Sequence, residues 1–443
     1  MSRRIVIVGG GSAGWGPKLM SDLMLTPALS GSTYVLHDFN ATNANRIANF
    51  ARKLAAKLGA SADIVVEGDP EQALTGADFI IITISTGGLS AMAHDLAIPE
   101  DYSIYHTVGD TMGPGGWART MRNVPVFVQM AERINRLAPN AVVLNYTNPM
   151  AQLTKTLAVS TSRPVVGLCH GLFEGLEALQ RLFNLESEDD IVATYGGVNH
   201  FFFITQLAIK GQDGYAMLRE KLAGGSLMDL VPQEYREHVH WWAVDEILKA
   251  TGMLTYMADR HIVEFLPQYL TSKENLERYH IHRTTIQERQ DNMRRAEQHI
   301  EEMTSGTIPD HYLERSRETA ADIIGAFATG KQFVDVGNTI NTGQISNVPL
   351  GAVVETPVLV NATGFHAVTI GGLPEPARTW VERVIRVEDM QVQAAMAGDL
   401  ELAFEALMLD PLCSHLNLDQ IREMGLRLLR ANQQYLPQFA GKL

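Results

Sequence analysis

A glycine-rich segment near the start of the chain constrains the fold more than any other feature of the sequence. The segment Gly9–Gly14 reads Gly-Gly-Gly-Ser-Ala-Gly, directly follows the apolar run Ile5–Val8, and leads into a helical pattern at Pro17–Leu25. A strand, a G-x-G-x-x-G turn and a helix in this order are typical of a dinucleotide-binding βαβ unit, in which the helix N-terminus faces the pyrophosphate. We therefore expect the first residues of the chain to bind a dinucleotide.

The glycines of this motif have separate expected roles. Gly9 permits the tight turn, Gly11 lets the backbone approach the pyrophosphate, and Gly14 allows the helix to pack closely. The next apolar run, Thr33–Leu36, is followed two residues later by Asp38, an acid that accepts hydrogen bonds from the adenosine ribose and repels a 2′-phosphate. The sequence therefore favours NAD over NADP. The expected cofactor residues are Gly9, Gly10, Gly11, Ser12, Gly14, Trp15 and Asp38.

The first two hundred residues repeat one pattern, in which a short β-branched run is followed by Gly, Asn or Asp and then by a helical pattern. This alternation predicts an α/β fold with a doubly wound parallel sheet of Rossmann type. The runs lack strict polar–apolar alternation, as expected for strands covered on both faces. They are Ile5–Val8, Thr33–Leu36, Asp63–Val66, Phe79–Ile84, Ala141–Leu144 and Pro164–Leu168.

The second half of the chain has a different sequence pattern, which predicts an α+β domain. The charge-rich stretch Ser272–Met303 indicates one extended helix, and Asn338–Gly372, rich in Val, Thr, Gly and Pro, indicates antiparallel strands with turns. Helical patterns follow at Pro376–Leu409 and Leu418–Gln434. We expect residues 1–195 to form the NAD-binding domain and residues 196–443 to form a second domain packed directly against it.

The composition excludes several classes of partner. Lys and Arg number 36 against 50 Asp and Glu, and the formal net charge of -14 opposes binding to nucleic acid or acidic membranes. No segment approaches the roughly 18 apolar residues that span a bilayer, and the apolar run at the N-terminus is too short for a signal peptide. The two cysteines, Cys169 and Cys413, fit a reducing compartment. These features predict a cytoplasmic protein.

Residues with metal-ligand chemistry follow two of the apolar runs. Cys169 comes directly after Pro164–Leu168, at the carboxyl end where open α/β sheets gather ligands, and His200 precedes the aromatic run Phe201–Phe203. A thiolate and an imidazole, helped by oxygen ligands, suit a divalent transition metal such as manganese. Spacing alone also allows Cys169 to be a small buried hydrophobe and His200 a hydrogen-bonded core residue.

Three polar segments add candidate site residues. Gly109–Gly116 and Asn145–Pro149 combine glycine or amide side chains with positions after apolar runs, where backbone can approach a ligand closely. In Ala258–His261 an acid, a permanent cation and a titratable ring are consecutive. Taken singly, the first two segments are equally well explained as structural loops and the third as an exposed salt bridge.

Together these motifs resemble glycoside hydrolase family 4, the NAD- and metal-dependent glycosidases that hydrolyse without the usual pair of carboxylates. Beyond residue 205 the resemblance is nearest to the α-galacturonidase-like members. It implies that NAD+ takes a hydride from carbon 3 of the sugar, a base removes the proton at carbon 2, and the aglycone is eliminated. Water then adds and the hydride returns, so the cofactor is regenerated in each turnover.

The resemblance also implies roles for individual residues. Cys169 and His200 hold Mn2+ or another divalent metal, which binds the 2- and 3-oxygens of the sugar. Asn148 positions the substrate, with Asn199 as a weaker neighbour. For the base the resemblance leaves two residues open. The implied acid–base residues are Asp110 as the acid toward the leaving group, and Asp259 or Tyr256 as the base.

The sequence indicates the substrate less sharply than the cofactor. The segment Cys169–Leu172 reads Cys-His-Gly-Leu, which resembles members acting on unphosphorylated sugars. A uronate carboxylate matches the planar fork of an arginine, which Arg260 or Arg119 can supply. We expect an α-linked hexuronide, foremost a galacturonide, with α-galactosides, α-glucosides and α-glucuronides as alternatives. A net hydroxy-acid dehydrogenase and a non-catalytic NAD sensor are further alternatives. The resemblance implies a homodimer or homotetramer, with the second domain binding substrate and forming the interface.

Overall fold

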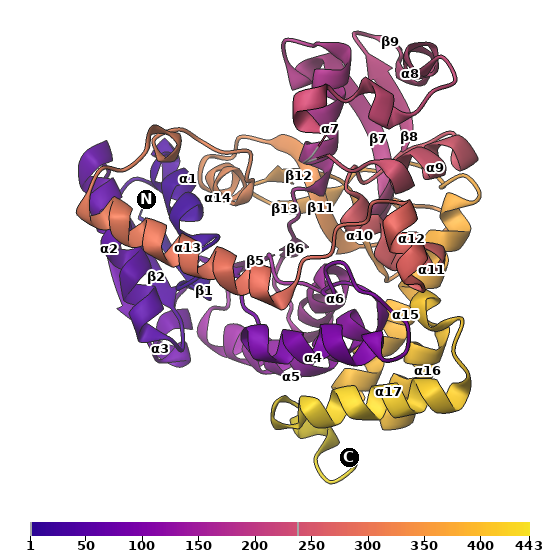
Figure 1. Cartoon of the computed structure of the whole chain (residues 1–443). Helices are drawn as coiled ribbons and strands as arrows, with labels where there is room; N and C mark the ends of the chain where they lie inside the picture. Colours follow the sequence, from indigo (N-terminus) through magenta and orange to yellow (C-terminus); the bar gives the residue numbers. More distant parts are fainter. Residues whose placement is uncertain (1, 237–238) are drawn as a thin grey trace.

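A parallel six-stranded sheet forms the centre of the computed structural model, which describes residues 2–236 and 239–443 (Figure 1). Its strands run in the order β3-β2-β1-β4-β5-β6, and every neighbouring pair is parallel. This is the strand order of a doubly wound dinucleotide-binding sheet, so the predicted Rossmann-type fold is confirmed. The strands are β1 (Arg4–Val8), β2 (Ser32–His37), β3 (Ala62–Glu67), β4 (Phe79–Ile82), β5 (Val142–Asn145) and β6 (Val165–Gly167).

Helices cover both faces of this sheet, which explains why its strands lack polar–apolar alternation. In β1, Val6 and Val8 belong to one buried apolar cluster, whereas Ile5 and Ile7 belong to another. Successive side chains of a strand point to opposite faces, so both faces of β1 are buried. The helices of this half are α1 (Gly16–Met24), α2 (Ala41–Leu58), α3 (Pro70–Leu74), α4 (Gly88–Glu100), α5 (Gly113–Leu137), α6 (Met150–Ser160) and α7 (Gly171–Phe183).

Antiparallel strands from the second half extend the same sheet beyond β6. The extension runs β6-β11-β12-β7-β8-β10, with β13 beside β12 and β9 beside β8. The domain boundary expected between residues 195 and 196 falls inside β7, so the two parts share one continuous sheet. The strands are β7 (Ile191–Val198), β8 (Phe201–Ile209), β9 (Gln212–Asp213), β10 (Leu254–Thr255), β11 (Phe333–Ile340), β12 (Val353–Asn361) and β13 (Gly364–Ala367). The antiparallel strands predicted for Asn338–Gly372 are confirmed by β11, β12 and β13.

The single helix predicted for Ser272–Met303 is wrong, because the segment forms two helices, α12 (Lys273–Arg278) and α13 (Ile286–Ser305). The backbone of residues 279–285 is held by tertiary hydrogen bonds: Thr284 N donates to Thr107 O, and Arg283 Nε donates to His106 O. Thr285 then caps α13 by accepting from Glu288 N. Charge periodicity could not reveal this break, because the partners lie in a distant loop.

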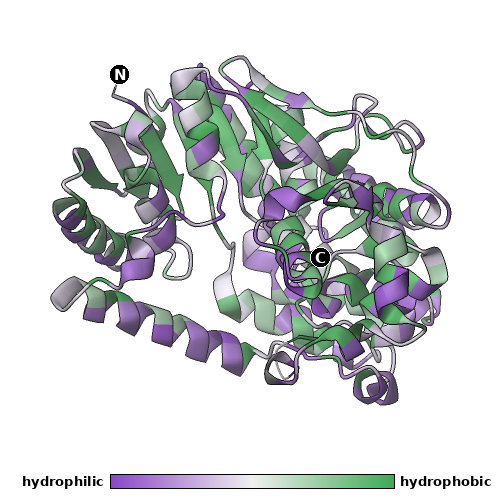
Figure 2. Cartoon of the chain, turned by 90° about the horizontal axis from the view of Figure 1, so that it is seen from above, coloured by the Kyte–Doolittle hydropathy of each residue, from purple (hydrophilic) through white to green (hydrophobic). Residues whose placement is uncertain are grey.

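The helix α13 contacts α2 and α4, so it joins the second half of the chain back to the first. Figure 2 shows α13 as largely hydrophilic, in contrast to the hydrophobic strands. None of the described helices is long and apolar enough to cross a membrane.

The C-terminal helices pack beside α5 and support the loop that leads into it (Figure 1). Trp117 Nε1 donates to Ala403 O at 2.7 Å across this contact. The pattern predicted as one helix over Pro376–Leu409 is divided at Gly398, which has a left-handed φ of 63° and ends α15. The remaining helices are α8 (Gly214–Leu222), α9 (Trp242–Thr251), α10 (Asp259–Ile262), α11 (Pro267–Leu270), α14 (Ala320–Thr329), α15 (Ala377–Ala397), α16 (Leu400–Leu409) and α17 (Leu418–Ala431).

Candidate functional site

The glycine turn after β1 has the tight geometry that its sequence predicts. Gly9 has a φ of 89°, its N donates to His37 O at 2.9 Å, and an added Cβ would lie 2.1 Å from Thr83 O. An added Cβ on Gly10 would lie 2.8 Å from Leu36 Cα, and one on Gly11 2.8 Å from Asn43 Cβ. No larger residue fits at these three positions without moving backbone.

Asp38 lies at the end of β2, where it ties the glycine turn to the beginning of α2. Its Oδ2 accepts from Gly11 N at 3.0 Å, and its Oδ1 accepts from Asn40 N at 2.8 Å. The carboxylate is therefore oriented toward the glycine turn, and its predicted contact with the adenosine ribose stays a prediction.

The packing role predicted for Gly14 is wrong. An added Cβ on Gly14 would meet no atom within 4 Å, whereas one on Gly16 would lie 3.0 Å from Ile47 Cδ1. Close packing of α1 against α2 therefore occurs one half-turn later than the motif suggests, because the helix begins only at Gly16. Ser12 Oγ accepts from Trp15 N at 3.4 Å within the turn itself.

Gly14 and Trp15 instead line a cavity of about 600 Å³ beside the turn. The Trp15 ring is 36% exposed, and its centroid lies 5.4 Å from that of Tyr146 and 5.7 Å from that of His170. The cavity also reaches Thr83 and Glu174. Its aromatic wall and position next to the glycine turn fit the flat ring of a nicotinamide cofactor.

Asn148 and Arg119 meet at the carboxyl end of the parallel sheet. Arg119 Nε, on α5, donates to the backbone oxygen of Asn148 at 2.9 Å. The Asn148 Oδ1 atom is buried and has no hydrogen-bond partner within the described residues. A buried polar oxygen without a partner is costly, so this atom fits a role in binding a ligand hydroxyl.

The loop before α5 is held by one buried carboxylate oxygen. Glu264 Oε1 accepts from the backbone N–H groups of Thr107, Val108 and Gly109 at 3.0, 2.9 and 2.8 Å. His106 Nδ1 lies 3.0 Å from the same oxygen, and its Nε2 accepts from a backbone N–H of α5. These bonds fix the position of the next residue, Asp110.

Asp110, His200 and His261 come together at the end of this loop. One ligand atom from each lies within 4.8 Å of the others, and the two imidazole centroids are 4.3 Å apart. Burial lowers the pKa of His200 to about 4 and that of His261 well below its usual range, so both rings are neutral at pH 7. A carboxylate beside two neutral imidazoles can bind a divalent transition metal.

The Cys169 sulfur lies outside this set in the described part of the chain. Burial, reinforced by the Glu355 carboxyl, raises the pKa of the Cys169 thiol above its usual range. Asn199 is fully buried next to the thiol and donates from Nδ2 to Glu355 Oε2 at 3.0 Å, while its own Oδ1 has no described partner. Asn199 thus lies between the predicted metal residue Cys169 and a buried acid that the sequence did not indicate.

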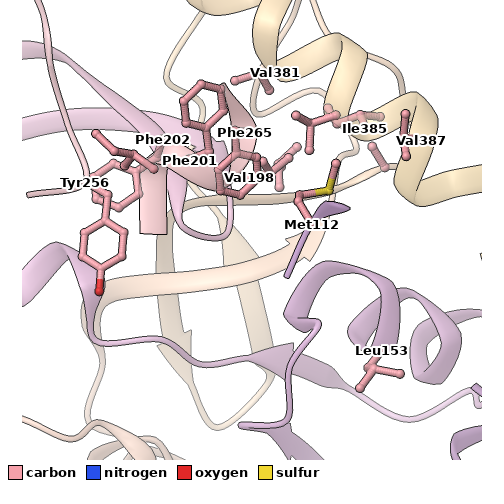
Figure 3. Packing of buried hydrophobic residues seen from close by; sticks show 14 of the residues in the cluster. Met112, Leu153, Val198, Phe201, Phe202, Tyr256, Phe265, Val381, Ile385 and Val387 are labelled. Carbon is pink, nitrogen blue, oxygen red and sulfur yellow. The ribbon is translucent and has the colours of Figure 1, made fainter. Parts of the chain in front are cut away.

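Tyr256 packs directly against the two histidines. Its ring centroid lies 5.5 Å from that of His200 and 5.3 Å from that of His261, and Oη donates to Glu174 Oε2 at 3.1 Å. Figure 3 shows the Tyr256 ring beside Phe202, with its oxygen pointing away from the apolar cluster. Burial, followed by the Glu174 carboxylate, raises the pKa of Tyr256 well above its usual value.

Asp259 and Arg260 lie outside the metal-binding set of Asp110, His200 and His261 among the described residues. Asp259 is buried, and its two oxygens accept from Ala243 N and Val244 N at 3.0 Å, at the first turn of α9. Burial raises the pKa of Asp259 to about 7. Arg260 is exposed and lines a second cavity of about 870 Å³. Glu174 lines both this cavity and the first one.

Sequence reasoning missed several residues of this site. The sequence indicated His261 only as part of the Asp-Arg-His run, and it gave no role to Glu264, Glu174 or Arg289. Arg289 donates from Nη2 to Val108 O at 2.9 Å, and its buried Nε has no described partner. Its position within a charge-rich helix gave no signal, because such helices are usually solvated on all sides.

Two family models match this chain: "Family 4 glycosyl hydrolase" over residues 4–185 and its C-terminal domain over residues 195–413. An α-galacturonidase from Bacillus subtilis is 32% identical over 92% of this chain and 93% of the relative. The structure of lplD from Bacillus subtilis, assigned as a glucosidase, has a TM-score of 0.88 at 28% identity and covers 97% of this chain and 100% of that one. A 6-phospho-α-glucosidase from gut microorganisms, solved with NAD and Mn2+, has a TM-score of 0.82 at 21% identity, over 99% of both chains.

Proposed function

Because this chain belongs to family 4 of the glycosyl hydrolases, we propose that it is an NAD- and manganese-dependent glycosidase of α-linked hexuronides, foremost α-galacturonides. The observation that carries the proposal is the meeting of Asp110, His200 and His261 near Tyr256, in a fold whose glycine turn suits NAD. The similarity to an α-galacturonidase supports the substrate class. A related fold solved with NAD and Mn2+ supports the cofactors.

The residues present fit both groups. Gly9, Gly11 and Asp38 shape the dinucleotide turn. Cys169 and His200 are the proposed metal ligands, and Asp110 and His261 lie beside His200. When bound, NAD+ takes up and returns a hydride and the divalent metal acts as a Lewis acid toward the sugar.

Tyr256 is the better placed of the two candidate bases. Its ring lies against the histidines of the site, whereas both Asp259 oxygens are occupied by backbone N–H groups of α9. In this proposal Tyr256 passes its hydroxyl proton to the Glu174 carboxylate, and Oη takes up the proton from carbon 2. Asp110, which lies beside the two histidines, is the proposed acid toward the leaving group.

Substrate recognition is assigned to amide and guanidinium groups. The unpartnered Asn148 Oδ1 can accept a hydrogen bond from a sugar hydroxyl, and Asn199 Oδ1 offers a second acceptor. Arg119 is buried near Asp110 and Arg260 is exposed at the neighbouring cavity, so either can bind a uronate carboxylate. The free thiols of Cys169 and Cys413 support the proposed cytoplasmic location.

The test is an assay of α- and β-linked uronides, galactosides, glucosides and their 6-phosphates in D2O with NAD+, MnCl2 and a thiol reductant. We expect release of galacturonic acid that depends on NAD+ and Mn2+, with deuterium incorporated at carbon 2. Product without deuterium would rule out elimination. NADH formed in amounts equal to product would instead indicate a dehydrogenase.

A further inference from the structure

Residues of four strands form a buried row where the two halves of the sheet join. Asn338 on β11 pairs with Gly167 on β6 and with Glu355 on β12, and Glu355 pairs in turn with Gly197 on β7. Residues that face each other across neighbouring strands project to the same side, so the Asn338 and Glu355 side chains lie next to each other. An added Cβ on Gly167 would crowd Asn338 Cβ at 3.0 Å. Both polar side chains are fully buried.

The Glu355 carboxyl binds two amides through one of its oxygens. Its Oε2 accepts from Asn338 Nδ2 at 2.8 Å and from Asn199 Nδ2 at 3.0 Å. Because this oxygen accepts from both amides at once, each asparagine presents its nitrogen to Glu355 and turns its oxygen away. A proton on Oε1 would leave the arrangement unchanged. The Asn199 Oδ1 atom is buried and has no described hydrogen-bond partner.

We propose that Glu355, braced by Asn338, is a positioning residue that turns the Asn199 amide oxygen toward the substrate. The proposal rests on the proposed function for the sugar alone. Asn199 directly follows β7 and precedes His200, which the proposed function places beside the sugar. Without the Glu355 oxygen the amide could turn over and present Nδ2, which accepts no hydrogen bond from a hydroxyl.

Stability of the fold does not explain this buried carboxyl. Glu355 Oε1 has no described partner, and burying a carboxyl that is only partly hydrogen-bonded costs free energy. An apolar side chain of similar size would avoid that cost. Glu388 on α15 provides a comparison, because it is also buried with an unpartnered Oε1, and no described hydrogen bond joins it to a site residue.

An electrostatic effect on Cys169 is the main competing explanation. The Glu355 carboxyl lies near this thiol and raises its pKa, after the larger effect of burial. Glu355→Gln separates the two explanations, because glutamine keeps an accepting oxygen but carries no charge. Glu355→Met removes both the acceptor and the charge while keeping a side chain of similar length.

The first experiment measures KM and kcat of the full chain with NAD+, MnCl2 and the α-linked glycoside that it cleaves best. We expect Glu355→Met to raise KM by about fivefold with kcat little changed, because one hydrogen bond to the bound sugar is lost. Glu355→Gln and the matched control Glu388→Met should stay within about twofold of the unaltered chain. Unchanged KM in Glu355→Met, or an equal rise in Glu355→Gln, would overturn the proposal.

A double-mutant cycle shows whether Glu355 acts through Asn199. In an Asn199→Ala background, Glu355→Met should have no further effect on KM, because the amide that it orients is absent. An equal rise in KM in both backgrounds would mean that Glu355 acts by another route and would refute the positioning role.

NMR of the full chain, labelled with 15N at its asparagine side chains, tests the amide orientation without any sugar. We expect two amide signals protected from solvent exchange, one of which disappears in Asn199→Ala and the other in Asn338→Ala. This measurement decides the orientation even if Glu355→Met fails to fold, and an unprotected Asn199 amide would contradict the proposal. A chain with both protected signals that hydrolyses no glycoside would refute the proposed function and leave the Glu355 arrangement intact.

Discussion

His200 occupies a backbone conformation that glycine and asparagine adopt far more readily. Its φ of 65° places it in the left-handed region, at a cost of about 1 kcal/mol or more for a residue with a Cβ. The buried ring packs against Tyr256 and His261, and these contacts offset part of the free-energy cost. Because this conformation lowers stability and the ring packs against other titratable groups, we infer a functional role for His200.

The two candidate bases can be separated by single substitutions. Tyr256→Phe keeps the packed ring but removes the hydroxyl, so we expect kcat to fall by at least about a hundredfold with little change in thermal stability. Asp259→Asn should mainly destabilise the fold, by about 0.5–2 kcal/mol, because its carboxylate caps α9. Deuterium exchange at carbon 2 and thermal unfolding measure the two effects. Full deuterium exchange at carbon 2 in Tyr256→Phe would instead indicate that Asp259 is the base.

Asp410 makes the stability of the chain depend on pH. Its carboxyl is buried, accepts from Gly113 N and Leu412 N, and has a pKa raised by burial to about 6. The unfolded chain has the ordinary value of about 4, so between these values the folded state holds more protons. The contribution of Asp410 to the free energy of unfolding is therefore fully present below pH 4 and is lost as the pH rises through 6.

Asp410→Asn should remove this dependence. The difference in the free energy of unfolding between the unaltered chain and the variant should shrink by about 2–3 kcal/mol from pH 4 to pH 8. Urea unfolding at several pH values measures it. A difference that stays constant with pH would contradict the assignment.

Secondary-structure elements position the site through their ends. The β1–α1 turn, the loop before α5 and the β7–β8 turn each carry site residues, while the strands and helices between them form the buried core. Figure 3 shows this core at Phe201, Phe202 and Phe265, next to Tyr256. The rigid elements fix where each turn lies, so a small shift in their packing would displace the site residues that the turns carry.

The β1–α1 turn allows a matched test of two glycines. Gly9→Ala would place a Cβ 2.1 Å from Thr83 O at a φ of 89°, so we expect loss of NAD binding and lower thermal stability. Gly14→Ala meets no atom within 4 Å and should leave thermal stability unchanged. Calorimetric titration with NAD+ and thermal unfolding test both. Normal NAD affinity in Gly9→Ala would contradict the assigned turn.

At the scale of the whole molecule, one sheet joins the nucleotide-binding half to the second half. The sheet passes from β6 to β11 through the pair Asn338 and Gly167, so the residues on either side of this contact cannot move independently without breaking it. The predicted division at residue 195 therefore describes two parts of one continuous structure.

The oligomeric state is a prediction at this scale. Large apolar side chains remain exposed in the single chain, among them Val192 at 66% and Leu350 at 74%. Exposed apolar side chains can be buried when copies associate, so we expect a homodimer or homotetramer of the 48.8 kDa chain. Size-exclusion chromatography with light scattering gives the mass directly. A mass of one chain at micromolar concentration would contradict the prediction.

The sequence by itself determined the Rossmann core, because each of its signals is local. A buried strand, a glycine turn and a helix start lie within consecutive residues, and their steric demands do not depend on distant parts of the chain. The same locality allowed the tight turn at Gly9 to be predicted. It failed for the helix expected over Ser272–Met303 and for Gly14, where a distant loop and the true start of α1 decided the outcome.

Only the tertiary structure brought Asp110, His200 and His261 together and directed Asp259 toward α9 instead. Residues on three separate segments of the chain carry no sequence pattern that reports their distance, because that distance is set by the packing of the whole sheet. Side-chain direction is decided in the same way, by whichever backbone donors lie within reach. Part of the candidate site was therefore predictable from the sequence, whereas which residues lie together depended on the fold.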